Sequence, residues 1–249
     1  MSQRTIAIIQ ARMGSSRLPG KVLLPLNCEH VLTHDVRRVR AAETIDKVVI
    51  ATSTETADDA IKQFGSEHDV PIFRGSETNV QQRMFDTATV HDADIVVRIT
   101  ADCPLIDPDT INTVVSQIQK ENAEYASNIS KRTFPRGLDV EAFSYESFER
   151  VVSTASTQRE CEHVTPYYQD NPNEFKSVNI ASEEVFDNPK YINRSDIRLT
   201  LDEAADYLLL KRIYDEIEYS EIINIREVID YVDSEELADL NEAVQQKKA

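Results

Sequence analysis

Several residue types are scarce in this sequence, and each scarcity argues against a class of protein. Tryptophan is absent, and there are 5 glycines and 3 cysteines in 249 residues. The cysteines (Cys28, Cys103 and Cys161) are widely spaced and form no Cys-x-x-Cys pair. This argues against a disulfide framework or a zinc knuckle and predicts a reducing, cytoplasmic location. No apolar run approaches the roughly 18 residues of a membrane span, and the N-terminus shows no secretory leader, so we expect no membrane association.

Basic residues are also scarce. Lys and Arg total 27 against 44 Asp and Glu, which gives a net charge of −17. Proteins that bind nucleic acid generally present a basic surface, so we expect no nucleic-acid partner. The excess of acid fits either a solubilising surface or a salt-adapted organism, and both interpretations stay open. With 41% hydrophobic residues, the chain is long and apolar enough to bury a sizeable core.

Strand-like and helix-like segments alternate in the first half of the chain. The strand-like runs are 5–9, 47–51, 71–74 and 95–99, and the helix-like segments are 31–41, 57–67, 80–91 and 108–120. Such alternation is typical of βαβ units, and it predicts an α/β fold with a mostly parallel sheet.

The second half is less regular. We expect strands at 125–128, 140–143, 175–180 and 197–201, helices at 145–154 and 160–169, and acidic helices from residue 204 onward. No internal repeat or Pro/Gly-rich linker interrupts the chain. We therefore predict a single domain, 1–249, with an inserted or flanking subregion at about 125–195.

The loop that follows the first predicted strand carries the clearest functional pattern. Residues 10–21 (QARMGSSRLPGK) contain Arg12, Arg17 and Lys21 but no carboxylate, and they hold two of the five glycines, Gly14 and Gly20. Cations combined with backbone that a ligand can approach closely indicate a binding site for a multiply charged phosphate. The spacing matches neither a Walker A loop nor Gly-x-Gly-x-x-Gly. The alternative is a solvated surface turn.

Two carboxylates follow short predicted strands. Asp102 comes after 95–99 and precedes a proline, and Asp202 comes after 197–201. Mg²⁺ prefers hard oxygen ligands, few of them from protein, so these two residues are the candidate metal ligands. Capping a turn or helix is the alternative for each, and Asp202 would then cap the helix that starts at Ala204. The Asp92-Ala93-Asp94 pattern resembles the metal-binding motif of glycosyltransferases but precedes its strand, at the wrong edge of the sheet.

A second cationic loop precedes the strand predicted at 140–143. Lys131, Arg132 and Arg136 are suited to holding an anionic acceptor such as a sugar acid or sugar phosphate. Asp139 and Glu141 alternate and therefore face one side, either toward acceptor hydroxyls or as an exposed strand face. Further along the chain, His163 either contacts the acceptor, acts as an acid or base, or is structural.

A series of segments resembles the cytidylyltransferases that activate sugars and sugar acids. These enzymes include the CMP-3-deoxy-manno-octulosonate synthetases and the spore-coat polysaccharide biosynthesis branch. The resembling segments are IIQARMGSSRLPGKVL (8–23), VVIATS (48–53), PIFRGSETNV (71–80), VVRITADCPLIDP (96–108), FPRGLDVEAFS (134–144), EHVTPYY (162–168) and RLTLDEAADYLLLKRIY (198–214). They cover most of the chain in the family's order. The common form of the family has an acid where Arg136 stands.

The resemblance implies a nucleotide-diphospho-sugar-transferase-like, three-layer αβα domain with a mixed, mainly parallel sheet. It implies transfer of CMP from CTP to a sugar-type acceptor with release of pyrophosphate, in surface-polysaccharide or glycoconjugate biosynthesis. It also implies Mg²⁺ as cofactor and a homodimer, with the 125–195 subregion serving the acceptor side and dimerisation. The competing hypotheses are a nucleotide-sugar-dependent glycosyltransferase and a non-catalytic nucleotide-binding protein.

The resemblance also assigns residues to each role. The expected catalytic residues are Arg12, Lys21 and Asp102, and the expected metal ligands are Asp102 and Asp202. The expected nucleotide-binding residues are Gln10, Ala11, Arg12, Met13, Gly14, Ser15, Arg17, Lys21, Ser76, Arg83 and Arg98. The expected acceptor-binding residues are Arg136, Asp139, Glu141 and His163.

Overall fold

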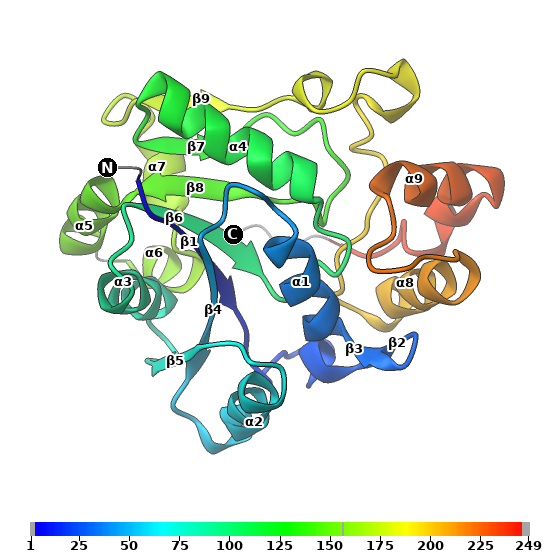
Figure 1. Cartoon of the computed structure of the whole chain (residues 1–249), viewed down its shortest axis with the longest axis horizontal. Coiled ribbons are helices and arrows are strands. Elements are labelled where there is room, and N and C mark those ends of the chain that lie inside the picture. The colour runs from blue at the N-terminus through cyan, green and yellow to red at the C-terminus, as the bar shows by residue number, and fades with distance from the viewer. Residues whose placement is uncertain (1–2, 156, 246–249) are drawn as a thin grey trace.

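A computed structural model describes residues 3–155 and 157–245 and shows a central seven-stranded sheet (Figure 1). From one edge to the other, its strands are β5 (Ile72–Gly75), β4 (Lys47–Ser53), β1 (Thr5–Gln10), β6 (Ile95–Thr100), β8 (Glu141–Ser144), β7 (Tyr125–Ser127) and β9 (Ser177–Asn179). The pairs β5–β4, β4–β1, β1–β6 and β7–β9 are parallel, and β8 is antiparallel to both β6 and β7. The predicted mixed, mainly parallel sheet is confirmed.

Helices cover both faces of the sheet. One face carries α1 (Val31–Arg40), α2 (Asp59–Glu67) and α4 (Pro108–Glu121). Helices α8 (Ala204–Glu216) and α9 (Ile225–Ser234) extend the same core beyond α1, where Tyr214 of α8 contacts His34 of α1. The other face carries α3 (Val80–Val90), α5 (Tyr145–Thr154), α6 (Gln158–His163) and α7 (Pro166–Asp170) (Figure 1). The remaining ladder is a small hairpin, β2 (Pro25–Leu26) with β3 (Glu29–His30).

The alternation along β1 explains why both faces are covered. Ala7 and Ile9 pack into the core of the first face, while Ile6 and Ile8 pack into the core of the second. Because side chains alternate along a strand, an uninterrupted apolar run gives a strand that is buried on both sides. None of the helices among the described residues combines the length and apolar character that crossing a membrane requires.

Two predicted elements are wrong. Residues 197–201 form no strand, because they make only one isolated bridge, between Arg136 and Arg198. The helix predicted at 160–169 is two short helices, α6 and α7, which are separated at Val164 with φ = 72°. Pro166 begins α7, where its missing N–H costs nothing, whereas inside a continuous helix that N–H would be needed.

The sheet brings the predicted site residues to one edge. Because β1, β4 and β6 are parallel, their carboxyl ends meet there, so the loop 10–21 and Asp102 both emerge at this edge. The antiparallel strand β8 starts at the same edge, where Glu141 lies opposite Arg98. The strands of the 125–195 subregion belong to this same sheet.

Candidate active site

A cavity of about 790 Å³ opens at the carboxyl ends of the central strands. Twelve of the predicted site residues line it: Gln10, Arg12, Ser15, Arg17, Lys21, Arg98, Asp102, Arg136, Asp139, Glu141, His163 and Asp202. Its walls carry six Arg and Lys side chains against five carboxylates, although the whole chain has a net charge of −17. This local excess of cations suits an anionic ligand.

The loop 10–21 is held in shape by its own backbone and by one buried carboxylate. The N–H groups of Ser15 and Gly20 both donate to the carbonyl oxygen of Met13, over 2.9 Å. Gly20 has φ = 71°, a conformation that glycine adopts without strain, and it leads directly into a short 3₁₀ turn at Lys21–Leu23. The N–H of Met13 donates to Asp58 over 2.7 Å, which ties the loop to the end of β4. Asp58 was not predictable from the sequence, because its partner lies 45 residues away.

Lys21 lies between the two predicted metal ligands. Its Nζ donates to Asp102 Oδ2 over 2.7 Å, to the carbonyl oxygen of Leu201 over 2.7 Å and to Asp202 Oδ1 over 2.9 Å. Burial alone would lower the pKa of Lys21, but the charges of Asp102 and Asp202 outweigh it and raise the pKa above the usual value. The ammonium therefore stays charged and holds both carboxylates close together.

Asp202 is the most heavily paired carboxylate of the cavity. Besides Lys21, it contacts Arg17 over 2.7 Å and Arg198 over 2.8 Å. Burial raises its pKa, but the charges of Lys21 and the two arginines offset this and lower the pKa below the usual value. The alternative role as helix cap is wrong, since Glu203 occupies the cap position of α8 and the Asp202 carboxylate points to the cations instead.

Asp206 organises the segment that carries Asp202. This fully buried carboxylate accepts hydrogen bonds from the N–H groups of Asp202 and Glu203, both over 2.9 Å, and from Asn241 over 2.8 Å. It also pairs with Arg198 Nε over 2.8 Å. Asp206 thereby provides the hydrogen-bond acceptor for the two N–H groups that precede α8, and it fixes the backbone that carries Asp202.

We expect Asp206→Asn to lower the free energy of unfolding by about 2 kcal/mol, because an amide NH₂ would face donors that the fully buried carboxylate now accepts from, and Arg198 would lose one of its carboxylate partners. Urea denaturation followed by circular dichroism measures the loss. Asp215→Asn is the matched control, since Asp215 is an exposed residue of the same helix whose ion pair, among the described residues, is with Lys211. It should leave the free energy of unfolding unchanged, and equal losses in the two variants would contradict the role given to Asp206.

Two internal ion pairs line the part of the cavity that is predicted to hold the acceptor, the predicted acceptor side. Arg98 pairs with Glu141 and also donates to Gln10 Oε1 over 3.0 Å. Arg132 donates two parallel hydrogen bonds, of 2.6 and 2.8 Å, to the carboxylate of Asp139. The predicted alternative of an exposed strand face is wrong, because Glu141 is 2% exposed and both carboxylates are neutralised inside the cavity.

Arg136 is the exception among the cations of the predicted acceptor side. No hydrogen bond or ion pair of its guanidinium occurs within the part of the chain that the structure describes. Burial and the neighbouring charge of Arg132 lower its pKa. His163 also lines the cavity, and burial lowers its pKa, so the ring is largely neutral at pH 7.

Five predicted nucleotide-binding residues do not line this cavity: Ala11, Met13, Gly14, Ser76 and Arg83. Ser76 is exposed and precedes the true cap of α3, which is Asn79. Arg83 is 2% exposed and donates to the carbonyl oxygen of Ser76, and burial lowers its pKa to about 10. Gly14 lies next to this segment, since a Cβ there would be 3.7 Å from Glu77 Oε1.

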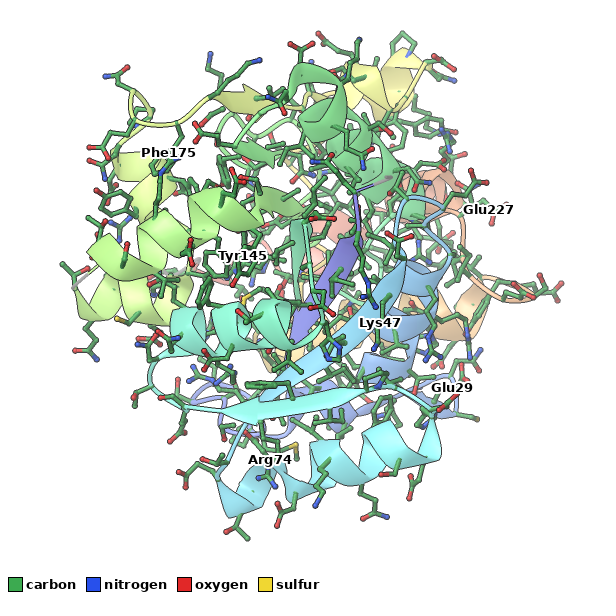
Figure 2. The ribbon with its side chains drawn as sticks, turned by 60° about the vertical axis from the view of Figure 1, so that its left-hand side comes forward. Glu29, Lys47, Arg74, Tyr145, Phe175 and Glu227 are labelled. Atoms are coloured by element: carbon green, nitrogen blue, oxygen red, sulfur yellow. The ribbon has the colours of Figure 1, made fainter. Side chains whose placement is uncertain are left out.

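Three other charged residues lie outside the cavity lining. Arg74 belongs to β5, and its side chain lies on the side of the strand that faces α2 (Figure 2). It pairs there with Asp59 over 2.6 Å. Lys131 is exposed and outside the cavity lining. Asp92 is a turn residue with φ = 52° and an 86% exposed side chain, at the amino end of β6, so the glycosyltransferase-like motif lies away from the cavity.

The side chains available for a metal ion are two carboxylates. Among the described residues, no group of three or more His, Cys, Asp and Glu side chains is arranged to hold a metal. Asp102 and Asp202 nevertheless fit Mg²⁺. Their carboxylate oxygens and the carbonyl oxygen of Leu201 already surround one cation, the Lys21 ammonium, and all three are hard oxygen ligands. Mg²⁺ bound to one or two carboxylates normally completes its shell with substrate phosphates and water.

Further residues line the cavity that were not predicted from the sequence. Thr200, Glu162 and Gln169 line the cavity without having been predicted, and Glu162 lies 3.7 Å from Arg12. Cys103 also lines it, with Sγ 3.5 Å from Asp102 Oδ1, and burial raises its thiol pKa well above the usual value. The sequence signal for these residues is their position: Cys103, Glu162 and Thr200 lie within segments that resemble the family, and Gln169 directly follows one.

The matches to known proteins extend over all the residues that line the cavity. A family model described as cytidylyltransferase matches residues 6–246. The spore coat polysaccharide biosynthesis protein SpsF of Bacillus subtilis is 31% identical over 211 residues, which are 83% of this chain and 85% of SpsF. The solved structure of a cytidylyltransferase from Leptospira borgpetersenii serovar Hardjo-bovis is 31% identical, with a TM-score of 0.88, and the match covers 100% of both chains.

A more distant structure shows the same fold. It is a CMP:2-keto-3-deoxy-manno-octonic acid synthetase in complex with CTP, at 16% identity and a TM-score of 0.62. The match covers 86% of this chain and 99% of that chain.

Proposed function

Because this chain belongs to the cytidylyltransferase family of enzymes, we propose that it transfers CMP from CTP to a hydroxyl group of a sugar, a sugar acid or a related small acceptor, with release of pyrophosphate. One observation carries the proposal: a single cavity combines the cations of the loop 10–21, the Asp102–Asp202 pair and a cationic acceptor side. The names of SpsF and of the octonic acid synthetase support an acceptor used in building polysaccharides or related glycoconjugates.

The nucleotide end of the cavity is the loop 10–21. Arg12, Arg17 and Lys21 reach the cavity from this loop and are suited to bind the triphosphate of CTP. When the acceptor oxygen attacks the α-phosphorus in line, negative charge develops on the leaving pyrophosphate. These cations stabilise that charge, and their fixed positions mean that little reorganisation is needed during the reaction.

Asp102 and Asp202 are the residues that would hold Mg²⁺. A bound Mg²⁺ would neutralise phosphate charge and lower the pKa of an acceptor hydroxyl, so a dedicated general base is not required. Arg17 and Arg198 orient Asp202, and Asp206 fixes the backbone on which it sits. This arrangement pre-organises the carboxylates before the substrates arrive.

The acceptor end is the part of the cavity lined by Arg136, Asp139, Glu141 and His163. The pairing of Arg132 with Asp139 and of Arg98 with Glu141 leaves carboxylate oxygens positioned as hydrogen-bond acceptors for sugar hydroxyls. Neutral His163 can donate or accept a hydrogen bond there. Arg136 supplies a positive charge for an anionic group on the acceptor.

The proposal is tested by measuring pyrophosphate release with Mg²⁺, each of the four nucleoside triphosphates, and a panel of sugars, sugar acids and sugar phosphates. We expect release with CTP and with one class of acceptor. Release of a nucleoside diphosphate from a nucleotide-sugar would instead support a glycosyltransferase. Binding of CTP without turnover on any acceptor of the panel would count against the proposed reaction.

Arg136→Gln should raise KM for the acceptor about tenfold to a hundredfold, because it removes a charge-assisted hydrogen bond, while KM for CTP stays the same. Steady-state kinetics with each substrate varied in turn separates the two constants. Lys131→Gln is the matched control, since Lys131 lies in the same loop but outside the cavity. An equal rise in both KM values, or no change in either, would show that Arg136 does not bind the acceptor.

A further inference from the structure

We propose that the Lys21 ammonium occupies the cation site between Asp102 and Asp202 until CTP binds, so that the nucleotide controls when a metal ion can load. This inference rests on the proposed function and adds an order of binding to it. Three oxygen atoms from two distant segments converge on one nitrogen: Asp102 Oδ2, the carbonyl oxygen of Leu201 and Asp202 Oδ1, at 2.7, 2.7 and 2.9 Å.

The donor set around Lys21 is the one that a divalent metal would use. Two carboxylate oxygens and one carbonyl oxygen are hard ligands, which Mg²⁺ and Mn²⁺ prefer. The side chains involved are well shielded, at 12% exposed for Lys21, 22% for Asp102 and 11% for Asp202. Arg17 already shares Asp202 Oδ1 with the ammonium, from the edge of the site and over 2.7 Å. A divalent ion bound to all three oxygens would have to occupy the position of Lys21 Nζ itself, and it would be repelled strongly there because water is mostly excluded.

The two carboxylates depend on Lys21 to different degrees. Asp202 keeps Arg17 and Arg198 as partners when Lys21 leaves. Asp102 has Lys21 as its one cationic partner among the described residues. Departure of the ammonium therefore exposes Asp102 as a carboxylate that lacks a counter-charge, which is the state that binds a metal ion tightly.

The position of Lys21 in the chain connects this exchange to the nucleotide. Lys21 is the last residue of the cationic loop 10–21 and the first of the 3₁₀ turn Lys21–Leu23. The same loop contributes Arg12 and Arg17 to the cavity. A triphosphate that binds to this loop brings oxygen atoms with more negative charge than the two carboxylates and attracts the flexible ammonium. Once Lys21 has moved to the phosphates, Asp102, Asp202 and the carbonyl oxygen of Leu201 would be available to hold a metal ion.

The test measures Mn²⁺ binding to the purified protein without nucleotide or acceptor, by electron paramagnetic resonance of free Mn²⁺. Lys21→Met removes the charge and keeps an unbranched side chain that is one atom shorter. We expect this variant to bind Mn²⁺ at least about tenfold more tightly than the unaltered protein. The gain should disappear in Lys21→Met combined with Asp102→Asn. Lys211→Gln, an exposed residue of α8, is the control and should leave Mn²⁺ binding unchanged.

Equal or weaker Mn²⁺ binding by Lys21→Met would overturn the proposal. A gain that persists when Asp102 is also replaced would overturn it as well, since the ion would then be bound elsewhere. Lys21→Gln is the second variant, used if thermal unfolding shows that Lys21→Met is not folded, and the same outcomes apply to it. Because no turnover is measured, the result is independent of whether the pyrophosphate assay identifies an acceptor.

Discussion

Replacement of Asp102 by Asn is expected to lower kcat for CMP transfer about a thousandfold while leaving the fold intact. Asp102 lies two residues after the end of β6, and its carboxylate lines the cavity, where Lys21 Nζ lies 2.7 Å away. Asn has almost the same shape but carries no charge, so it provides a much weaker ligand for a hard cation. Pyrophosphate release at saturating CTP and acceptor measures the loss.

Asp92→Asn is the control for this prediction. Asp92 belongs to the glycosyltransferase-like Asp-x-Asp pattern, lies at the opposite edge of the sheet and has an exposed side chain. Asn tolerates its positive φ of 52°, so this variant should keep full activity and stability. If Asp102→Asn retained more than a tenth of the original turnover, or if Asp92→Asn lost activity, the assignment of Asp102 as the metal ligand would be wrong.

The fold class and the family were predictable from the sequence because their signals are local. Apolar runs such as 5–9 and 95–99 can be recognised as strands without knowing which segments they contact, and the structure confirms them as the central strands β1 and β6. The sequence signal was misleading at 197–201. Ile197, Leu199 and Leu201 alternate and are at most 1% exposed, as in a strand. Their burial comes from packing against the core, while the backbone pairs with Arg136 at one position only.

The candidate site was predictable to the extent that each residue follows a strand end or sits in a cationic loop. This is why the loop 10–21 and Asp102 were found. Pairing across the cavity was not predictable, because it depends on residues that are far apart in sequence. The Lys21–Asp102 contact spans 81 residues, and the Arg98–Glu141 contact spans 43. Only the structure shows that these partners neutralise one another and that Arg136 has none among the described residues.

Gly137→Ala is expected to destabilise the protein by about 3 kcal/mol or more, through backbone strain and overlap. Gly137 has φ = 105°, a conformation that residues with a Cβ rarely adopt. A Cβ would lie 2.6 Å from the carbonyl carbon of Leu199, 2.7 Å from the nitrogen of Thr200 and 2.8 Å from the oxygen of Leu199. All three are backbone atoms, so a side-chain rotation cannot relieve the overlap. Urea denaturation measures the change in the free energy of unfolding.

Gly14→Ala is the matched control, since its φ is not positive and its Cβ would have 3.7 Å to the nearest atom. Its free energy of unfolding should change by less than about 1 kcal/mol.

Gly137 packs against the segment that continues to Asp202, so Gly137→Ala should also lower the activity of the fraction that still folds. If stability fell but activity per folded molecule did not, the position of the loop that carries Gly137 would not matter for the reaction. If both fell, the close contact at Gly137 would align this loop with the carboxylates of Asp102 and Asp202.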